Sequence, residues 1–217
     1  MSTRLRAIVF DLWDTLVDWP VDGWADVQRR VAARLGLEEE RFVELWRETY
    51  DIRQIGPLGD ALRALGGDEA ATGDVLTLRR DFTRTALAPR PGAVDTLVEL
   101  RRRGFLLGMI SVCSEEVAEL WDETPFADLI DSAVFSCSVG FRKPDPRIYR
   151  LCLEELGVEP EEALFVGDGA NDELAGAERV GMRAVLIHRP GQEPIWEEAR
   201  AFKGRRITSI PEVLELC

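Results

Sequence analysis

Four polar residues in this sequence have side chains that together suit the transfer of a phosphoryl group, and each lies at or beyond the end of a short apolar run. They are Asp11, Ser111, Lys143 and Asp168. The Asp11 carboxylate is a nucleophile that could attack phosphorus and form an acyl-phosphate. Lys143 would neutralise charge on the nucleophile and on the transferred group, while Ser111, Thr15 and main-chain N–H groups would donate hydrogen bonds to phosphate oxygens.

The carboxylates of Asp11 and Asp168 would repel each other strongly unless a hard cation lay between them, and Mg²⁺ takes such oxygen ligands. Asp172 is a further candidate ligand because it lies in the same short segment as Asp168. That segment, "GDGAND" at residues 167–172, supplies glycines that allow close backbone approach, ahead of a predicted helix whose N-terminus favours anions. The sequence therefore predicts a bound Mg²⁺ ion as cofactor.

The elements that must position these residues are predicted from an alternation of apolar and helical segments. Runs typical of buried strands occupy residues 7–10, 105–110, 133–136, 163–168 and 183–187. Segments that favour helices and separate the later runs are residues 93–103, 115–121, 146–156 and 171–181. This alternation predicts an α/β fold with a mostly parallel sheet and helices on both faces, whose ligand site lies at the carboxyl ends of the strands. Neighbouring strands would bring the four polar residues to one rim.

Residues 19–88 interrupt this alternation with a purely helical pattern. The stretches "FVELWRETY" and "DVLTLRRDFTRTAL" place apolar residues at helical spacing. We therefore expect an all-helical unit of residues 19–88 and a core made of residues 1–18 and 89–217. Four tryptophans would either line a substrate pocket between the two units or pack one unit against the other; they are Trp13, Trp19, Trp24 and Trp46.

Composition narrows the range of partners. The chain has 217 residues, with 40 acidic and 27 basic side chains and a formal net charge of −13, which argues against nucleic acid and anionic membranes. No segment approaches the roughly 18 consecutive apolar residues that a membrane span needs. The N-terminal stretch has too few consecutive apolar residues for a secretory signal, so a cytoplasmic location is expected. The four cysteines lack metal-binding spacing. We expect a small-molecule substrate and a monomer or homodimer.

Taken together, the motifs resemble a known family. "FDLWDTL", Ser111, "KPDPRIY" and "VGDGANDELAGA" resemble, in order and approximate spacing, the four signatures of the haloacid dehalogenase superfamily, which consists mostly of phosphatases. The resemblance extends from about residue 6 to residue 190. It implies a Rossmann-like three-layer sandwich, with residues 19–88 as the cap that closes over the active site and selects substrates.

The resemblance also implies a role for each matching residue. Asp11 would be the nucleophile, Thr15 and Ser111 would orient it or bind the substrate anion, Lys143 would be the charge-neutralising lysine, and Asp168 would be a metal ligand. By the same resemblance, Asp172 would hold the metal directly or through water, and Asn171 would position the loop. The main-chain carbonyl of Trp13 would bind the metal whatever side chain this position carries.

The side chain of Trp13 departs from the phosphatase pattern. Phosphatases of the superfamily have an Asp there, which protonates the leaving oxygen and then deprotonates the attacking water. Loss of general acid–base help typically lowers the rate by about 10²- to 10⁴-fold for a poor leaving group. A leaving group that departs as a stable anion would lose much less. On an extended chain the neighbouring Asp14 would point away from Trp13, which argues against Asp14 as a replacement acid.

An aromatic residue at this position is instead similar to the dehalogenase branch, because halide leaves without a proton. "LWR" at residues 45–47 resembles the stretch that carries the halide- and carboxylate-binding Arg of those enzymes, which makes Arg47, beside Trp46, a substrate-binding candidate. Tyr149 falls where they keep a functional Tyr. However, Asp168 stands where their metal-free sites have no acidic residue.

An anionic Asp168 beside an attacking carboxylate favours a cation. The sequence thus indicates a Mg²⁺-dependent phosphatase that forms an aspartyl-phosphate, acting on a small phosphorylated metabolite. A metal-independent 2-haloacid dehalogenase is the alternative, and a catalytically impaired phosphate-binding protein is a further one.

Overall fold

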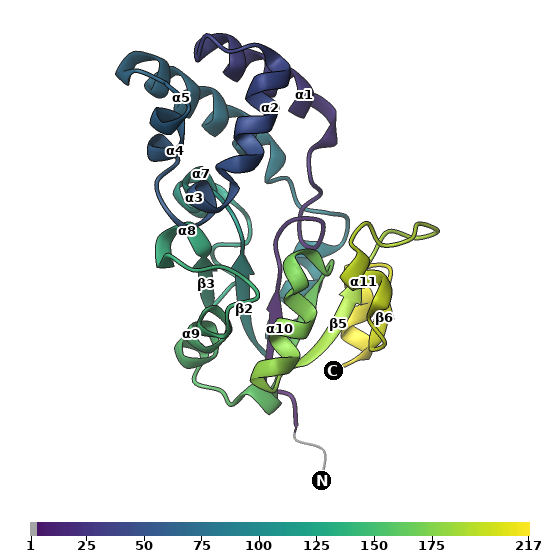
Figure 1. The fold of residues 1–217 in the computed structure, drawn as a ribbon. Coiled ribbons are helices and arrows are strands. Elements are labelled where there is room, and N and C mark those ends of the chain that lie inside the picture. The colour runs from purple at the N-terminus through teal and green to yellow at the C-terminus, as the bar shows by residue number, and fades with distance from the viewer. Residues whose placement is uncertain (1–3) are drawn as a thin grey trace.

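The computed structural model describes residues 4–217, except for the side chain of Asp22, and is built around a six-stranded parallel sheet (Figure 1). Its strands lie in the order β3-β2-β1-β4-β5-β6. Their bounds are β1 (Ala7–Phe10), β2 (Leu106–Ser111), β3 (Ser132–Phe135), β4 (Ala163–Gly167), β5 (Arg183–Ile187) and β6 (Arg205–Ile207). Every neighbouring pair is parallel, so all six carboxyl ends lie along one edge of the sheet.

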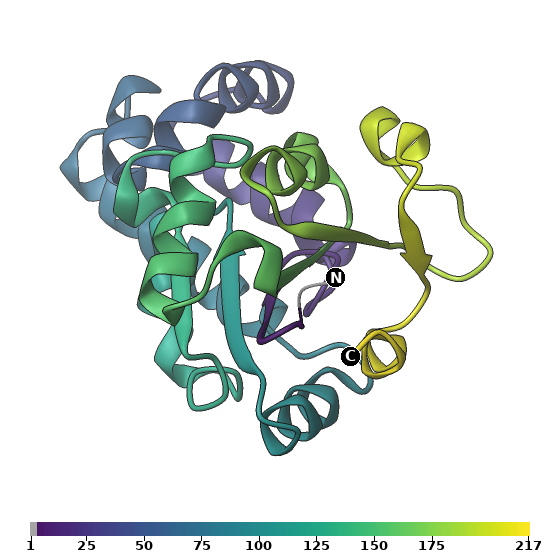
Figure 2. The ribbon, with the colours of Figure 1, turned by 90° about the horizontal axis from the view of Figure 1, so that it is seen from below.

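Helices cover both faces of the sheet (Figure 2). Side chains alternate along β1, so that Ala7 and Val9 pack with α9 (Pro146–Leu156) and α10 (Glu173–Val180) on one face. Ile8 and Phe10 point to the other face, where the core includes residues of α6 (Ala93–Arg102). The expected three layers of an α/β fold are therefore confirmed.

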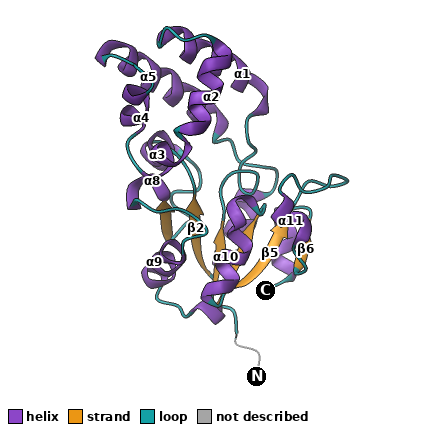
Figure 3. Cartoon of the chain, viewed as in Figure 1, coloured by secondary structure: helices purple, strands orange, loops and turns teal. Residues whose placement is uncertain are grey.

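Six helices follow β1 before β2, and the first five of them lie beyond the carboxyl ends of the strands (Figure 3). These five are α1 (Val21–Arg34), α2 (Glu39–Glu48), α3 (Tyr50–Ile55), α4 (Leu58–Ala64) and α5 (Glu69–Ala86). Apolar residues at helical spacing, such as Phe42 and Trp46 on α2, give this helical group a hydrophobic core of its own. The unit boundaries at residues 18/19 and 88/89 stay a prediction.

Short helices connect the helical group to the sheet. The helix α3 contacts α8 (Ser136–Val139), and α5 contacts α7 (Glu115–Glu119). The remaining short helical elements are η1 (Trp121–Glu123), η2 (Pro160–Glu162), η3 (Ala170–Asp172), α11 (Glu197–Ala201) and η4 (Ile210–Glu215). Among the described residues, no helix is long and apolar enough to cross a membrane.

The strand expected at residues 183–187 has these bounds, and the others shift by one residue or less at each end. The helix α9 begins as expected, because the Asp145 side chain accepts a hydrogen bond from the Arg147 amide and Pro146 occupies the first turn. The strand β6 was not expected. It is a three-residue edge strand in which Ile207 alone is buried, so it has no apolar run.

The close approach of α9 to β2 requires glycine at position 108. A Cβ atom there would lie 2.7 Å from Cys152 Sγ and 3.1 Å from Leu156 Cδ1. We expect Gly108→Ala to lower the free energy of unfolding by about 1 to 3 kcal/mol because of this overpacking. In contrast, Gly73→Ala on the exposed side of α5, where no atom lies within 4 Å, should raise it by about 0.5 to 1 kcal/mol. Urea denaturation of both variants measures the difference, and equal midpoints would contradict the packing account.

Candidate active site

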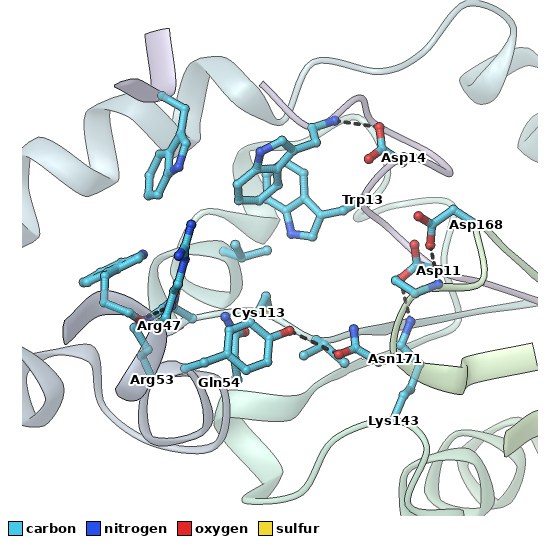
Figure 4. Close-up of a pocket in the computed structure, with 18 of the residues that line it drawn as sticks. Asp11, Trp13, Asp14, Arg47, Arg53, Gln54, Cys113, Lys143, Asp168 and Asn171 are labelled. Carbon is cyan, nitrogen blue, oxygen red and sulfur yellow. Dashed lines mark hydrogen bonds and ion pairs between the residues drawn. The ribbon is translucent and has the colours of Figure 1, made fainter. Parts of the chain in front are cut away.

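Lys143 lies at the centre of the polar residues that the strands bring together (Figure 4). Its ammonium nitrogen Nζ is 2.5 Å from Asp11 Oδ1, 2.5 Å from Glu173 Oε2 and 2.9 Å from the Ile110 carbonyl oxygen. The side chain is 1% exposed. Burial acts to lower the pKa of Lys143, but the carboxylates of Asp11 and Glu173 outweigh it and raise that pKa. Lys143 is therefore a permanently charged group in a buried site.

Three carboxylates surround this lysine. One oxygen from each of Asp11, Asp168 and Glu173 lies within 4.8 Å of the other two. Asp168 is oriented by two donors, because its Oδ1 accepts from the Ala170 amide at 3.0 Å and its Oδ2 from Trp196 Nε1 at 2.8 Å. Burial, together with the Asp11 charge, raises the pKa of Asp168 to about 6. Three acidic groups and one lysine leave an excess of negative charge that suits a hard cation.

Glu173 was missed by the sequence analysis, which named Asp172 instead. Asn171 and Asp172 both have left-handed backbone conformations, with φ of 54° and 53°. As a result the Asp172 side chain points away from the carboxylate cluster and the Glu173 side chain points into it. Asp172 consequently lies at the surface, where its carboxylate pairs with Arg179 at 3.1 Å. Glu173 is fully buried, and its Oε1 accepts a hydrogen bond from the Gly169 amide at 2.9 Å. Asp172 is thus outside the carboxylate cluster, and Glu173 is inside it.

The hydroxyl groups of Thr15 and Ser111 are fully buried beside the Asp11 strand end. Neither Oγ atom has a hydrogen-bond partner among residues 4–217 as described. A buried hydroxyl without a partner costs free energy, so both are available to a bound ligand. Their role as donors to a substrate anion stays a prediction.

Asp11, Lys143 and Asp168 border a cavity of about 600 Å³ between the sheet edge and the helical group. Asp11, Lys143 and Asp168 lie at one end of it, whereas Arg47 and Arg53 lie at the opposite end (Figure 4). The walls between them are largely aromatic, and the indoles that line the cavity are those of Trp13, Trp19, Trp24, Trp46 and Trp196. The tryptophans named from the sequence therefore line the cavity and also pack against one another. The ring centroids of Trp13 and Trp19, for example, lie 5.1 Å apart.

The loop after β1 is not extended, contrary to the expectation for Asp14. The Leu16 amide bonds back to the Leu12 carbonyl at 2.8 Å, and Asp14 itself has φ of 54°. Asp14 therefore lines the same cavity as Trp13. Its Oδ1 is already engaged, however, because it accepts from the Trp19 amide at 3.1 Å and from Arg189 at 3.2 Å.

The other candidates separate into two groups. Asn171 lines the cavity, where its Oδ1 accepts from the Tyr50 hydroxyl at 3.3 Å, and Arg47 lines it as an exposed residue of α2. Tyr149 does not line it, since its ring is buried under α10 and its hydroxyl donates to the Glu173 carbonyl at 2.8 Å. Residues of the cavity that the sequence analysis did not single out include Tyr50, Arg53, Gln54, Arg79 and Trp196.

Comparison with known proteins agrees with this fold. The family model of the haloacid dehalogenase-like hydrolases matches residues 5–181, so the chain belongs to this family and is a hydrolase. It is 32% identical over 201 residues to glyceraldehyde 3-phosphate phosphatase of Methanopyrus kandleri, covering 85% of this chain and 84% of the relative. It is also 30% identical over 215 residues to (S)-2-haloacid dehalogenase 4A of Burkholderia cepacia, covering 92% and 90%. The structure of 2-haloacid dehalogenase from Pseudomonas syringae pv. Tomato has a TM-score of 0.75 and 25% identity, covering 98% and 97%.

The raised pKa of Asp168 makes the stability of the metal-free protein depend on pH. The folded state holds this proton up to about pH 6, whereas the unfolded chain releases it near 3.8, so the stabilisation from protonated Asp168 is lost as pH rises between these values. We expect Asp168→Asn, in the presence of a chelator, to be more stable than the wild type by about 2 kcal/mol near neutral pH, and the difference to vanish near pH 4. Urea titrations across this range measure it.

Asp172→Asn is the matched control, because Asp172 pairs with Arg179 at the surface and its left-handed backbone suits Asn. It should follow the wild-type pH dependence to within about 0.5 kcal/mol. A constant difference between Asp168→Asn and the wild type at every pH would contradict the assignment.

Proposed function

We propose that this hydrolase is a Mg²⁺-dependent phosphatase that acts on a small phosphorylated molecule through an aspartyl-phosphate intermediate. The observation that carries the proposal is the cluster of Asp11, Asp168 and Glu173 carboxylates around buried Lys143. A dehalogenase releases a halide ion and has no evident use for so much negative charge next to its nucleophile. A phosphatase that binds a cation does, since the cation and Lys143 together offset the charge of the nucleophile and the phosphate.

In this mechanism the Asp11 carboxylate attacks phosphorus in line with the leaving oxygen. Lys143 holds the attacking carboxylate by its contact with Oδ1 and offsets charge on the transferred group. The unpartnered hydroxyls of Thr15 and Ser111 donate to phosphate oxygens. Water then hydrolyses the aspartyl-phosphate and returns Asp11 to its carboxylate form.

The metal would be held by Asp11, Asp168 and Glu173, whose oxygen donors and negative charge fit Mg²⁺. When bound, it supplies positive charge that offsets the negative charge of the transferred phosphate. Binding by the main-chain carbonyl of Trp13 stays a prediction, as does a cap role for α1 to α5. The position of those helices over the site supports the cap role, because they supply the far wall of the cavity.

A first experiment compares the two reaction types directly. The purified protein is incubated with para-nitrophenyl phosphate and, separately, with 2-chloropropionate, each with Mg²⁺ and with a chelator. We expect phosphate release that the chelator abolishes. We also expect Asp11→Asn to reduce it by at least about 10³-fold, since the covalent route requires the carboxylate. Full activity of Asp11→Asn would overturn the mechanism.

A 2-haloacid dehalogenase is the second candidate function, and the aromatic side chain of Trp13 in the cavity favours it. The similarity to the Burkholderia cepacia enzyme, named as a dehalogenase, points the same way. This candidate predicts chloride release from 2-chloropropionate that the chelator does not affect. Such a result, without phosphate release, would replace the phosphatase proposal.

The phosphatase proposal makes a further prediction about Trp13. Because an indole cannot protonate the leaving oxygen, the wild type should turn over aryl phosphates at least about 10²-fold faster than alkyl phosphates. Trp13→Asp restores a carboxyl group at this position, so we expect it to reduce that ratio. Trp13→Phe, which keeps an apolar ring, should keep the ratio as it is. Steady-state rates on phenyl and propyl phosphate measure it, and a ratio near one in the wild type would refute the prediction.

A further inference from the structure

Two buried arginines lie at the end of the cavity opposite Asp11 and have no role in the chemistry described above. Arg53 belongs to α3 and Arg79 to α5, and the two residues are 7% and 6% exposed. Both guanidinium groups lie over the indole of Trp46, with centroid distances of 3.9 Å for Arg53 and 5.6 Å for Arg79. Both residues line the same cavity as the Asp11 cluster.

Within residues 4–217, only one of these two arginine charges is balanced by a carboxylate. Arg79 forms an ion pair with buried Glu116 of α7. Arg53 donates instead to the Trp46 carbonyl at 2.7 Å, and in the described part of the chain it has no ion pair with a carboxylate. Burial, together with the neighbouring charge of Arg79, lowers the pKa of Arg53 to about 10, so it still carries its charge at neutral pH. Two buried cations therefore share one buried anion, an arrangement that favours a second anion.

The hydrogen-bonding groups at this end of the cavity are also incomplete. Arg53 Nε, Arg79 Nε and Arg79 Nη1 are buried and have no hydrogen-bond partner within residues 4–217 as described. Guanidinium donors of this kind match the planar oxygens of a carboxylate or the oxygens of a phosphate. Gln54 Oε1 and Glu116 Oε2 are unpartnered acceptors nearby, and a bound water can satisfy them without using these donors.

We propose that Arg53 and Arg79 bind a second anionic group of the substrate, a carboxylate or a further phosphate, while the phosphate to be transferred lies at Asp11. The inference rests on the proposed phosphatase function for the identity of the first group. Between the two ends, the indoles of Trp13, Trp24 and Trp46 form apolar walls. The substrate class is therefore a phosphate ester whose leaving group has an apolar, aromatic body and carries an anion at its far end.

The missing acid at Trp13 agrees with this class. An aromatic alcohol departs as a relatively stable anion, so its phosphate ester depends less on protonation of the leaving oxygen than an alkyl ester does. The cavity of about 600 Å³ is large enough for a substituted benzene ring with a phosphate and a second charged group.

The test uses three phosphate esters built on one phenyl ring. They are 4-carboxyphenyl phosphate, 4-carbamoylphenyl phosphate and 1,4-phenylene bisphosphate. We expect kcat/KM for the carboxylate or the bisphosphate to exceed that for the neutral amide at least about 10-fold, and the two charged esters distinguish the two kinds of anion. The amide is the more electron-withdrawing substituent, so differences in leaving group act against this result.

Arg53→Met should abolish the preference for a charged ester, mainly through KM, because it removes the unpaired cation. It should leave the melting temperature unchanged or raise it, since no carboxylate loses its partner. Arg79→Lys keeps a cation beside Glu116 but removes the unpartnered donors, and should weaken the preference. The control is Arg80→Met, next in sequence on α5, exposed and paired with Glu119 at the surface, which should change nothing. A preference that survives Arg53→Met would overturn the inference.

A binding measurement separates this inference from the proposed function. Calorimetry with the Asp11→Asn variant compares 4-hydroxybenzoate with 4-hydroxybenzamide, and we expect the acid to bind at least about 10-fold more tightly, with equal affinities after adding Arg53→Met. Equal binding of acid and amide, together with phosphate release from all three esters, would overturn the inference and leave the phosphatase function standing. Binding that depends on Arg53 without any phosphate release would overturn the phosphatase function alone.

Discussion

The buried ammonium group of Lys143 is the contact on which the geometry of the active site depends. It joins Asp11 at the end of β1, the Ile110 carbonyl in β2 and Glu173 at the start of α10. Removing an ion from water costs several kcal/mol, about the amount that well-placed partners can return, so Lys143 is stable there only while all three elements keep their positions. One lysine thus couples the sheet, a covering helix and the candidate nucleophile.

Much of this arrangement could be predicted from the sequence, because it follows from chain direction. Strands β1 and β4 are short apolar runs that end in polar residues, and parallel neighbours place those ends on one rim. Asp11 and Asp168 therefore meet without any knowledge of side-chain contacts. The edge strand β6 shows the limit of this reasoning, since it is paired to the sheet but has almost no apolar pattern of its own.

The parts that could not be predicted depend on local backbone conformation or on contacts between distant segments. Two left-handed residues in a row turn Asp172 outward and Glu173 inward, and helical periodicity cannot foresee that change. Arg53 differs from Arg47 in being buried against Trp46, a contact within the helical group that spacing alone does not reveal. Tyr149, which the motif resemblance suggests for the site, instead packs under α10, where its hydroxyl donates to the Glu173 carbonyl.

The two ends of the cavity carry opposite charge that the described residues do not balance, and under the proposed phosphatase function this would make a site with Trp13 selective. Carboxylates at one end favour a cation, and buried guanidinium groups at the other favour an anion. Charged groups held in place before binding lower the reorganisation needed when ligands arrive. Trp13 lies between these ends, where its indole cannot protonate a leaving group and forms an apolar wall of the cavity. Under the proposed phosphatase function, Trp13 would therefore favour leaving groups that need no proton and aromatic groups that pack against indole, two properties that aryl esters combine.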